Sequence, residues 1–214
     1  MVGLTRITKP IDWQLYSDIY PNRYIQNSNS DFIIQNELSK IKHGKALDVG
    51  GGVNGTSYLI NWATDYLLLD TGVKSNLPFI SWNDLNSNSF NVVLARNSIN
   101  YLCQFNNHIQ IAQIAKSVCN NGKLIFNTFV SPPRQMKRRY LSKSSSGIEI
   151  AKIIANTPVV IMEHTLIPDD TNYIIKHKFF YYPIIFLKTI IESEGLLCRV
   201  IVNKKTAVFI CDKY

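Results

Sequence analysis

A glycine-rich segment carries the clearest chemical signature in this sequence. Residues 45–55 read KALDVGGGVNG, in which Asp48 precedes the consecutive glycines Gly50, Gly51 and Gly52. Glycines let the backbone turn sharply and approach a bound molecule, so a G-x-G-x-x-G spacing between a strand and a helix is typical of nucleotide-binding loops. An ordinary tight turn also uses glycine. The residues that follow the loop must therefore decide between these interpretations.

Two further aspartates follow the next two predicted strands. Asp70 ends the run YLLLD, and Asp84 follows LPFIS within the segment SWNDLN. In a doubly wound sheet the second strand ends beside the ribose of a bound nucleoside, where an acid accepts hydrogen bonds from the hydroxyls. An acid after the third strand is placed to accept one from an adenine amino group. These spacings predict a nucleoside site at the carboxyl edge of a sheet.

Alternating apolar and helical segments are expected to position these acids. ALDV, YLLLD, LPFIS, FNVVLA and KLIFNTFV are predicted to be strands buried on both faces, with TSYLINWA and HIQIAQIAKSV as helices between them. This alternation predicts an α/β fold with a parallel sheet. Residues 11–42 are expected to be helical, with Asp31 as the N-cap of the last helix. A helix and two strands are expected after Pro183.

The segment after Val130 has a different character. SPPRQMKRRYLSKSSSG is polar and basic, and we predict a loop there. VVIMEHTLI and NYIIKHKFFYY flank the turn signal PDDTN, which predicts an antiparallel hairpin.

Four short motifs in this order resemble the class I S-adenosylmethionine-dependent methyltransferases. LDVGGGVNG resembles their glycine-rich motif, Asp70 the ribose-binding acid, Asp84 with Leu85 the acid beside adenine, and FNVVLARNSINYL the fourth motif near the transferred methyl. The final order of helix and strands also resembles the family, so the resemblance covers residues 43–130 and 181–213. A nicotinamide-binding fold is the competing interpretation, and it accounts less well for Asp84 and the last strands.

The sequence departs from the family pattern at two positions. The usual third glycine falls at Asn54, with Gly55 one step later, and Asn91 stands where an aspartate is common. Asparagine tolerates positive φ better than other non-glycine residues, so the turn can survive. The position of Asn91 usually supports the strand end, so we expect no loss of activity from it.

The resemblance implies a single domain with a three-layer, Rossmann-like methyltransferase sheet, mostly parallel with an antiparallel last strand, plus N-terminal helices and a β-hairpin cap. Residues 1–42 would be a helical lid, 43–130 the cofactor-binding core, 131–182 the basic loop and cap, and 183–214 the C-terminal helix and strand pair. The implied cofactor is S-adenosyl-L-methionine, with no metal. The residues expected to contact it are Asp48, Gly50, Gly51, Gly52, Asp70, Thr71, Asp84, Leu85, Arg96, Asn97, Tyr24 and Arg23.

Individual roles follow from the same resemblance. Asp48 would orient the glycine loop and hold the cofactor's ammonium, directly or through water. Arg23 would pair with its carboxylate, and Tyr24 would belong to the lid. The alternatives are that the N-terminal tyrosines pack a helix on the sheet and that Asn97 and Ser98 only cap a turn.

Catalytic and substrate-binding residues are harder to identify, because methyl transfer needs alignment and, where the acceptor requires it, removal of a proton. His164 and His177 on the hairpin are candidate general bases, and Tyr101 is a candidate wall of the substrate pocket. Both histidines could instead be structural. A further basic cluster is expected to bind an anionic substrate, or else to be a solvated helical face: Arg134, Arg138 and Arg139.

Composition narrows the class of protein. The 214 residues carry a net charge of +8, and no Asp or Glu occurs between Asp84 and Glu149, so this region should attract anions. The beginning of the sequence shows no signal peptide, and no apolar run approaches about 18 residues, so we expect a cytoplasmic protein without a membrane span. The four cysteines form no metal motif and are expected to be free thiols: Cys103, Cys119, Cys198 and Cys211.

These observations predict an enzyme that methylates oxygen or nitrogen of a small, anionic metabolite. The first alternative is an RNA or nucleotide-bearing substrate, which is less favoured because no OB or KH module is visible. The second is transfer of a 3-amino-3-carboxypropyl group from the same cofactor. The third is a protein that has kept the fold and lost the chemistry, against which the intact Asp48, Asp70 and Asp84 argue. The oligomeric state does not follow from the sequence.

Overall fold

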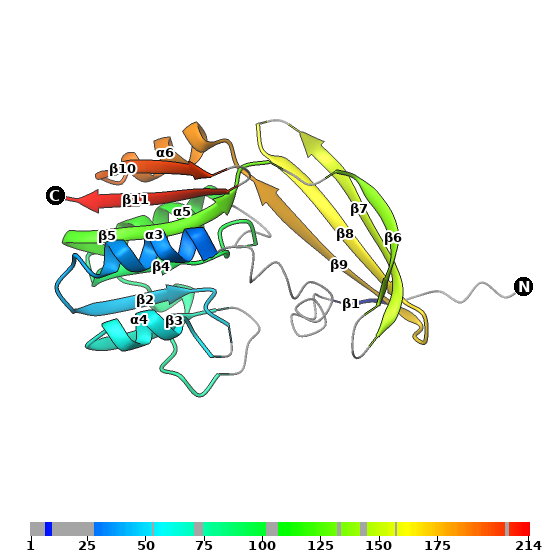
Figure 1. Cartoon of the computed structure of the whole chain (residues 1–214), viewed down its shortest axis with the longest axis horizontal. Coiled ribbons are helices and arrows are strands. Elements are labelled where there is room, and N and C mark those ends of the chain that lie inside the picture. Colours follow the sequence, from blue (N-terminus) through cyan, green and yellow to red (C-terminus); the bar gives the residue numbers. More distant parts are fainter. Residues whose placement is uncertain are drawn as a thin grey trace, which may run out of the picture. The chain divides into compact units, whose positions relative to one another are not determined.

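The computed structural model describes residues 7–9, 28–52, 54–70, 75–101, 107–131, 134–141, 145–156, 158–203 and 206–214. These residues divide into two compact units (Figure 1). The α/β unit holds the described residues of 29–131 and 182–214, and the β unit holds those of 1–28 and 132–181. The β unit thus combines most of the segment 131–182 with residues 7–9 from the beginning of the chain.

The α/β unit is built on a six-stranded sheet with the order β10-β11-β5-β4-β2-β3 (Figure 1). Strands β2 to β5 pair in parallel, whereas β11 pairs antiparallel with both β5 and β10. The expected mostly parallel sheet with an antiparallel last strand is confirmed. Its strands are β2 (Lys45–Val49), β3 (Asp65–Leu69), β4 (Phe90–Ala95), β5 (Val118–Phe129), β10 (Leu196–Asn203) and β11 (Thr206–Lys213).

Helices on both faces of this sheet explain why its central strands are almost continuously apolar. Helices α3 and α4 pack on one face, where Ile34 and Leu59 join Val92 and Ile125 of the sheet in one buried cluster. Helices α5 and α6 lie on the other face (Figure 1) and contact β5 and β10, respectively. The result is a three-layer α/β/α arrangement. The helices are α3 (Ser28–Leu38), α4 (Ser57–Trp62), α5 (Asn107–Lys116) and α6 (Ile184–Glu192).

The predicted strand LPFIS is reduced to a single bridge between Leu68 and Phe79. Leu68 N–H donates to the carbonyl of Pro78 at 2.8 Å and Ile80 N–H donates to the carbonyl of Leu68 at 2.9 Å. Pro78 has no N–H to contribute to a ladder, and Phe79 is 52 % exposed, so this edge neither pairs nor packs enough to extend. The prediction of a full strand is wrong here.

The first helix of this unit is present as predicted, but it begins earlier than expected. The segment DFIIQNELSKI is helical as expected, but α3 begins at Ser28, so Asp31 lies within the first turn and is not the N-cap. A carboxylate in the first turn is still favourable to the helix dipole. Of the expected helical lid, residues 7–9 are described and form a strand, so the prediction of helix is wrong there. The helices expected between residues 11 and 27 lie outside the described residues. At the base of the sheet, Asn91 Oδ1 accepts Lys45 N–H at 2.8 Å, which joins the start of β2 to β4.

The β unit is a five-stranded sheet with the order β1-β9-β8-β7-β6. Strands β6 to β9 are antiparallel neighbours, and β1 is parallel to β9. The predicted hairpin is confirmed as β8 and β9. The strands are β1 (Ile7–Lys9), β6 (Met136–Leu141), β7 (Ser146–Asn156), β8 (Val160–Pro168) and β9 (Tyr173–Tyr181).

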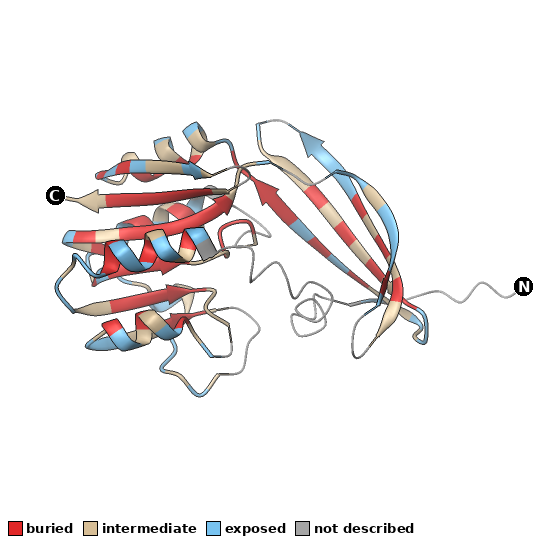
Figure 2. Ribbon diagram, in the orientation of Figure 1, coloured by how far each residue is buried: buried red, intermediate tan, exposed pale blue. Residues whose placement is uncertain are grey.

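The predicted loop after Val130 is wrong over residues 136–141, where MKRRYL forms the edge strand β6. Only Tyr140 of β6 is buried, so the strand shows no apolar alternation and its order comes from pairing with β7. Figure 2 shows β6 as largely exposed or intermediate. Charged side chains on an edge strand are also a common protection against pairing with other chains. The neighbouring β7, from Ser146 to Asn156, was not anticipated.

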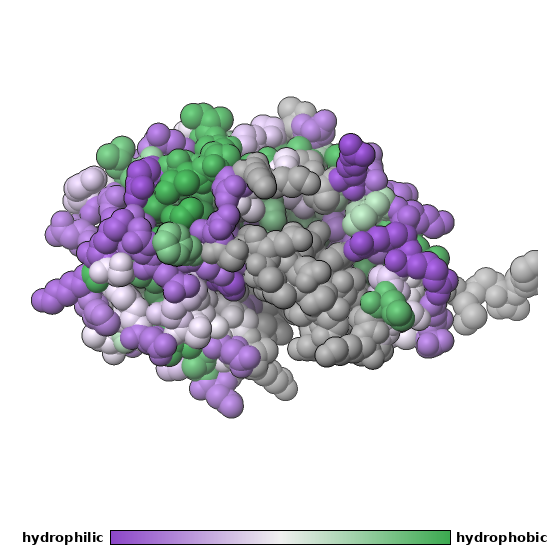
Figure 3. Space-filling model, viewed as in Figure 1, coloured by the Kyte–Doolittle hydropathy of each residue, from purple (hydrophilic) through white to green (hydrophobic). Residues whose placement is uncertain are grey.

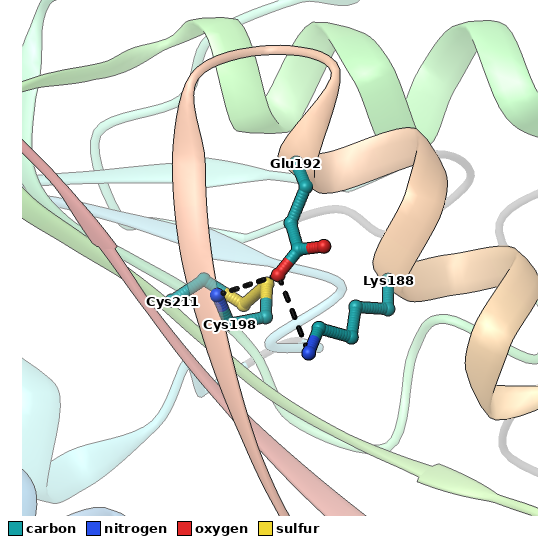
Figure 4. The surroundings of a disulfide bond; sticks show 4 residues. All are labelled: Lys188, Glu192, Cys198 and Cys211. Carbon is teal, nitrogen blue, oxygen red and sulfur yellow. Dashed lines mark hydrogen bonds and ion pairs between the residues drawn. A yellow bond between two sulfur atoms is a disulfide. The ribbon is translucent and has the colours of Figure 1, made fainter.

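The expectation of four free thiols is wrong for two of them. Cys198 and Cys211 are register partners on β10 and β11, with their Cα atoms 4.0 Å apart, and they form a disulfide (Figure 4). Glu192 Oε1 lies beside it, accepts Cys198 N–H at 3.3 Å and is 3.5 Å from Lys188 Nζ. Strand register brings the sulfurs together, and register cannot be read from cysteine spacing. Cys119 is free.

None of the described helices is long and apolar enough to cross a membrane. Figure 3 shows mostly polar side chains on one face of the molecule, with apolar ones gathered on the part that holds β10, β11 and α6. Ile185 of α6 and Leu197 of β10 are exposed.

Candidate functional site

The glycine loop after β2 has the backbone conformation that the sequence predicts. Gly50, Gly52 and Gly55 have φ of 71°, 74° and 60°, which is the left-handed region where side chains are disfavoured. A Cβ on Gly50 would lie 2.6 Å from the Cβ of Ser98, whereas one on Gly52 would meet no atom within 4 Å. The loop is therefore tight against the loop after β4 on one side and open at Gly52.

Asp48 ties this loop together from beneath. Its buried carboxylate accepts Thr56 N–H and the Tyr66 hydroxyl at Oδ2, each at 2.7 Å. Burial raises the pKa of Asp48, despite these two donors. A Cβ on Gly51 would lie 2.3 Å from the same Oδ2, so this glycine is required by the carboxylate. Asp48 Oδ1 is buried and has no hydrogen-bond partner among the described residues.

Asp70 joins the end of β3 to the glycine loop. Its Oδ2 accepts Gly52 N–H at 3.0 Å, and Gly50 N–H donates to the Leu69 carbonyl at 2.8 Å. Because β2 and β3 are parallel neighbours, their carboxyl ends meet at the same edge of the sheet. The acid and the loop that the sequence singled out are thus in direct contact. Thr71, predicted beside them, lies outside the described residues.

The third acid stands in a short 3-10 helix, Trp82–Asp84. Asp84 is exposed and accepts a hydrogen bond from the Ser81 hydroxyl, and the following Leu85 is partly buried. The bridge at Phe79 holds this segment beside β3. The carboxylate is thereby presented to solvent at the edge of the sheet.

Arg96, at the end of β4, is engaged with α3. Its Nε and Nη2 donate to Oδ1 and Oδ2 of Asp31 at 2.6 and 2.7 Å. The hydrogen bonds to Asp31 raise the pKa of Arg96. Tyr58 donates to Asp31 Oδ1 at 3.4 Å, and its burial raises the pKa of that phenol. Asp31 of α3 therefore joins both Arg96, at the edge of the sheet that carries the glycine loop, and Tyr58 of α4.

The turn after Arg96 is held by amide side chains. Asn97 has φ of 57°, donates its N–H to Asn127 Oδ1 at 2.7 Å and accepts Asn127 Nδ2 at its own Oδ1 at 2.5 Å. Asn100 Oδ1 accepts the Thr128 hydroxyl and Phe129 N–H, both at 3.0 Å. The sequence reasoning missed Asn127 and Thr128. In the sequence, these two residues differ from their neighbours only in being polar within the apolar run KLIFNTFV.

Tyr101 closes the same turn. Its N–H donates to the Ser98 carbonyl at 2.8 Å, and its side chain is partly exposed. Ser98 is buried against Gly50. Tyr101 thus follows the turn that adjoins the glycine loop, and its role as a pocket wall stays a prediction.

The predicted basic cluster is divided between the two faces of β6. Arg138 and Arg139 are consecutive strand residues, so their side chains point in opposite directions. Arg138 Nε donates to Glu149 Oε2 at 2.8 Å, and Arg139 Nη2 donates to Asp169 Oδ2 at 2.6 Å. Arg134 precedes the strand and is exposed. Because β6 is a strand, the alternative of a solvated helical face is wrong.

His164 and His177 form a buried group in the β unit. They are register partners on β8 and β9 with ring centroids 5.2 Å apart, and Phe179 packs edge-on to both at 4.6 Å. His164 Nδ1 is 3.1 Å from Oε1 of Glu149, which is itself completely buried and paired with Arg138. The structure brings both histidines together, on a unit other than the one that holds the glycine loop.

Tyr24 and Arg23 lie outside the described residues, so the predicted lid stays a prediction. Within the described ranges, no three His, Cys, Asp or Glu side chains are grouped so as to hold a metal ion.

Comparison with known proteins identifies the fold. No protein-family model matches the chain, and no curated protein matches it significantly. Solved structures do. An S-adenosylmethionine-dependent methyltransferase from Clostridium acetobutylicum superposes with a TM-score of 0.69 at 15% identity, covering 94% of this chain and 98% of that one.

Two similar structures are sugar methyltransferases by their descriptions. The sugar N-methyltransferase KedS8 from Streptoalloteichus has a TM-score of 0.67 at 12% identity, covering 95% of this chain and 93% of that one. The amino pentose methyltransferase CalS10 from Micromonospora echinaspora, solved with S-adenosylmethionine, has a TM-score of 0.63 at 12% identity, covering 96% and 99%. At such identities the likeness shows the fold, over nearly the full length of each chain.

Proposed function

Because the chain has the fold of the class I S-adenosylmethionine-dependent methyltransferases, we propose that it is such an enzyme and methylates nitrogen or oxygen of a small molecule. One observation carries the proposal. Asp70 is bonded to Gly52 N–H at 3.0 Å, at the one loop glycine where an added Cβ meets nothing within 4 Å. The acid proposed to bind the ribose therefore lies directly beside the part of the glycine loop that is open to a ligand.

The residues at this edge fit the proposed cofactor. A carboxylate accepts about four hydrogen bonds, so Asp70 can hold Gly52 N–H and two ribose hydroxyls together. Asp48 Oδ1, buried without a partner among the described residues, is an acceptor suited to an ammonium group, directly or through water. Asp84 and Leu85 would meet the adenine. The cofactor carries no phosphate, so the lack of a lysine in this glycine loop agrees with it.

When bound, S-adenosylmethionine supplies an electrophilic methyl group on a sulfonium, which a nucleophile attacks in line. The chain's own residues have to hold and orient the reactants. Asp48 and Asp70 fix the glycine loop from two sides, and the Asn97 turn packs against Gly50 through Ser98. Such preformed contacts reduce the ordering that binding would otherwise require.

Removal of a proton from the acceptor atom is a separate requirement. We keep His164 and His177 as candidates for this base, with Tyr101 as a pocket residue. If Glu149 accepts the Nδ1 proton of His164, then Nε2 is the basic atom of that ring. Arg134, Arg138 and Arg139 stay candidates for binding an anionic substrate.

The similar structures favour a small-molecule substrate. KedS8 and CalS10 are described as acting on sugars, and the Burkholderia thailandensis structure, at a TM-score of 0.50, is described as a 1,6-didemethyltoxoflavin N1-methyltransferase. We therefore favour an amine or hydroxyl on a small metabolite over RNA.

The test is product analysis. The protein is incubated with S-adenosylmethionine and a panel of amino sugars, hydroxylated metabolites, nucleotides and RNA, and the cofactor product is separated. S-adenosylhomocysteine formed with a small molecule supports the proposal. Methylthioadenosine would instead indicate transfer of the aminocarboxypropyl group. Turnover with RNA alone, with a steep dependence on salt, would move the substrate to nucleic acid.

A further inference from the structure

The side chain of Asn127 makes two reciprocal hydrogen bonds to a single neighbouring residue. Its Oδ1 accepts Asn97 N–H at 2.7 Å, and its Nδ2 donates to Asn97 Oδ1 at 2.5 Å. Asn127 lies near the carboxyl end of β5 and is almost completely buried. This pairing fixes which end of each carboxamide is oxygen, because a backbone N–H can only donate.

The pairing holds Asn97 in a conformation that it would not keep alone. A non-glycine residue with φ of 57° is in the sparsely populated left-handed region, where the backbone costs about 1 kcal/mol or more. Asparagine tolerates this region better than most residues, and the two hydrogen bonds offset the remaining cost. The pairing also commits Asn97 Oδ1 to Asn127. The other end of that carboxamide is the Nδ2 donor.

The Asn97 turn adjoins the glycine loop. Strands β2 and β4 are parallel neighbours with Asp48 opposite Leu94, so the loops that follow them leave the sheet side by side. The Ser98 side chain fills the space where a Gly50 side chain would stand, 2.6 Å from the ideal Cβ. A small rotation of the Asn97 turn would therefore be felt directly at Gly50.

We infer that Asn127 is a positioning residue for the cofactor site, acting through Asn97. It holds the Asn97 turn in the position in which Ser98 packs against Gly50 of the glycine loop. The inference rests on the proposed function, since it assumes that the glycine loop binds S-adenosylmethionine.

The test uses a substitution whose protonation restores the amide pattern. In Asn127→Asp, an ionised carboxylate would oppose the Asn97 Oδ1, whereas the protonated acid has both a C=O acceptor and an O–H donor. Burial favours the protonated form, so the change should occur at an accessible pH. We expect S-adenosylhomocysteine affinity, relative to wild type at the same pH, to be about tenfold weaker at pH 8.5 and to recover to within about twofold at pH 5.

Two further variants separate positioning from stability. Asn127→Leu removes both hydrogen bonds and should bind about tenfold more weakly at both pH values. Ser117→Ala removes a buried hydroxyl bond to the Ile114 carbonyl, 2.8 Å long, at the opposite end of β5, and should lower the melting temperature while leaving affinity unchanged. If Asn127→Leu does not fold, the two pH values for Asn127→Asp still decide the question.

The outcomes are distinct. A wild-type protein that binds no S-adenosylhomocysteine refutes the proposed function and this inference with it. A wild-type protein that binds, together with an Asn127→Asp variant whose relative affinity is the same at both pH values, overturns the inference alone. Equal loss of affinity in Ser117→Ala would also overturn it, because the effect would then be one of general stability.

Discussion

Replacement of Asp70 by alanine should weaken S-adenosylhomocysteine binding more than any other single change at the glycine loop. The proposed site gives Asp70 two ribose hydroxyls, and a hydrogen bond to a charged group contributes about 1.5 kcal/mol or more. Loss of both is about 3 kcal/mol, which corresponds to a dissociation constant roughly 100- to 200-fold higher. The substitution also removes the acceptor of Gly52 N–H, which adds to the loss.

Asp70→Asn separates the loss of charge at Asp70 from the loss of the acceptor for Gly52 N–H. Its carbonyl oxygen can still accept Gly52 N–H, but the charge and part of the acceptor capacity are gone, so we expect a loss of about tenfold. Asp65→Ala is the matched control. Asp65 lies at the opposite end of β3, its side chain is 57% exposed, and its Oδ2 is 3.5 Å from Lys45 Nζ. Its removal should leave affinity unchanged.

The assay is calorimetric titration of the three variants and wild type with S-adenosylhomocysteine, accompanied by thermal melts without ligand. The dissociation constant should be highest for Asp70→Ala, lower for Asp70→Asn, and lowest for Asp65→Ala and wild type, which should be equal. An Asp70→Ala variant that melts normally and binds as well as wild type would refute the assignment of Asp70 to the ribose.

Three further predictions concern stability. Burial raises the pKa of Glu37, but the hydrogen bonds and charges of Lys40 and Arg199 together outweigh it and lower this pKa below its ordinary 4.5. The resulting stabilisation is present above pH 4.5 and is lost as the pH falls through the folded pKa. In denaturant titrations, Glu37→Gln should thus be less stable than wild type by about 1–2 kcal/mol at pH 7, and this difference in stability should disappear at acidic pH. Glu194→Gln is the control: its carboxylate lies 3.6 Å from Lys116, and its loss should change stability little at either pH. Glu149→Ala leaves buried His164 and partly exposed Arg138 without their acceptor, so it should lower the free energy of unfolding in urea by about 3 kcal/mol. Glu163→Ala, on the opposite face of the sheet, is the control. A loss in Glu149→Ala no larger than in Glu163→Ala would contradict the buried pairing. Replacing both Cys198 and Cys211 by alanine should lower the free energy of unfolding by about 2–3 kcal/mol, because the link closes a loop of sequence separation 13. Reductant should lower the melting temperature of wild type and of Cys119→Ala, but not of the double variant. Any other pattern would argue against this disulfide.

Much of the α/β unit follows from local patterns. Strands β2, β4 and β5 are apolar because both faces are covered, and such runs are visible without any knowledge of the fold. The glycines are equally visible, because Gly50 and Gly52 must adopt positive φ. Asp70 could be identified from its place at the end of β3. Each of these signals is carried by residues close together in the sequence.

The features that were missed depend on residues far apart in the sequence. Strand β6 has one buried side chain, Tyr140, and is ordered by pairing with β7, so its own composition resembles a loop. The Cys198–Cys211 link depends on the register of two strands. Asn127 matters through Asn97, which is 30 residues away. Tertiary pairing of this kind leaves no periodic signal in a single sequence.

The measurement that tests the central claim most directly is calorimetric titration of the purified wild-type chain with S-adenosylhomocysteine, with NAD as the control ligand. The glycine loop, Asp48 and Asp70 predict micromolar binding of S-adenosylhomocysteine and none of NAD. Binding of NAD instead, or of neither ligand, would contradict the claim that this edge of the sheet is an S-adenosylmethionine site.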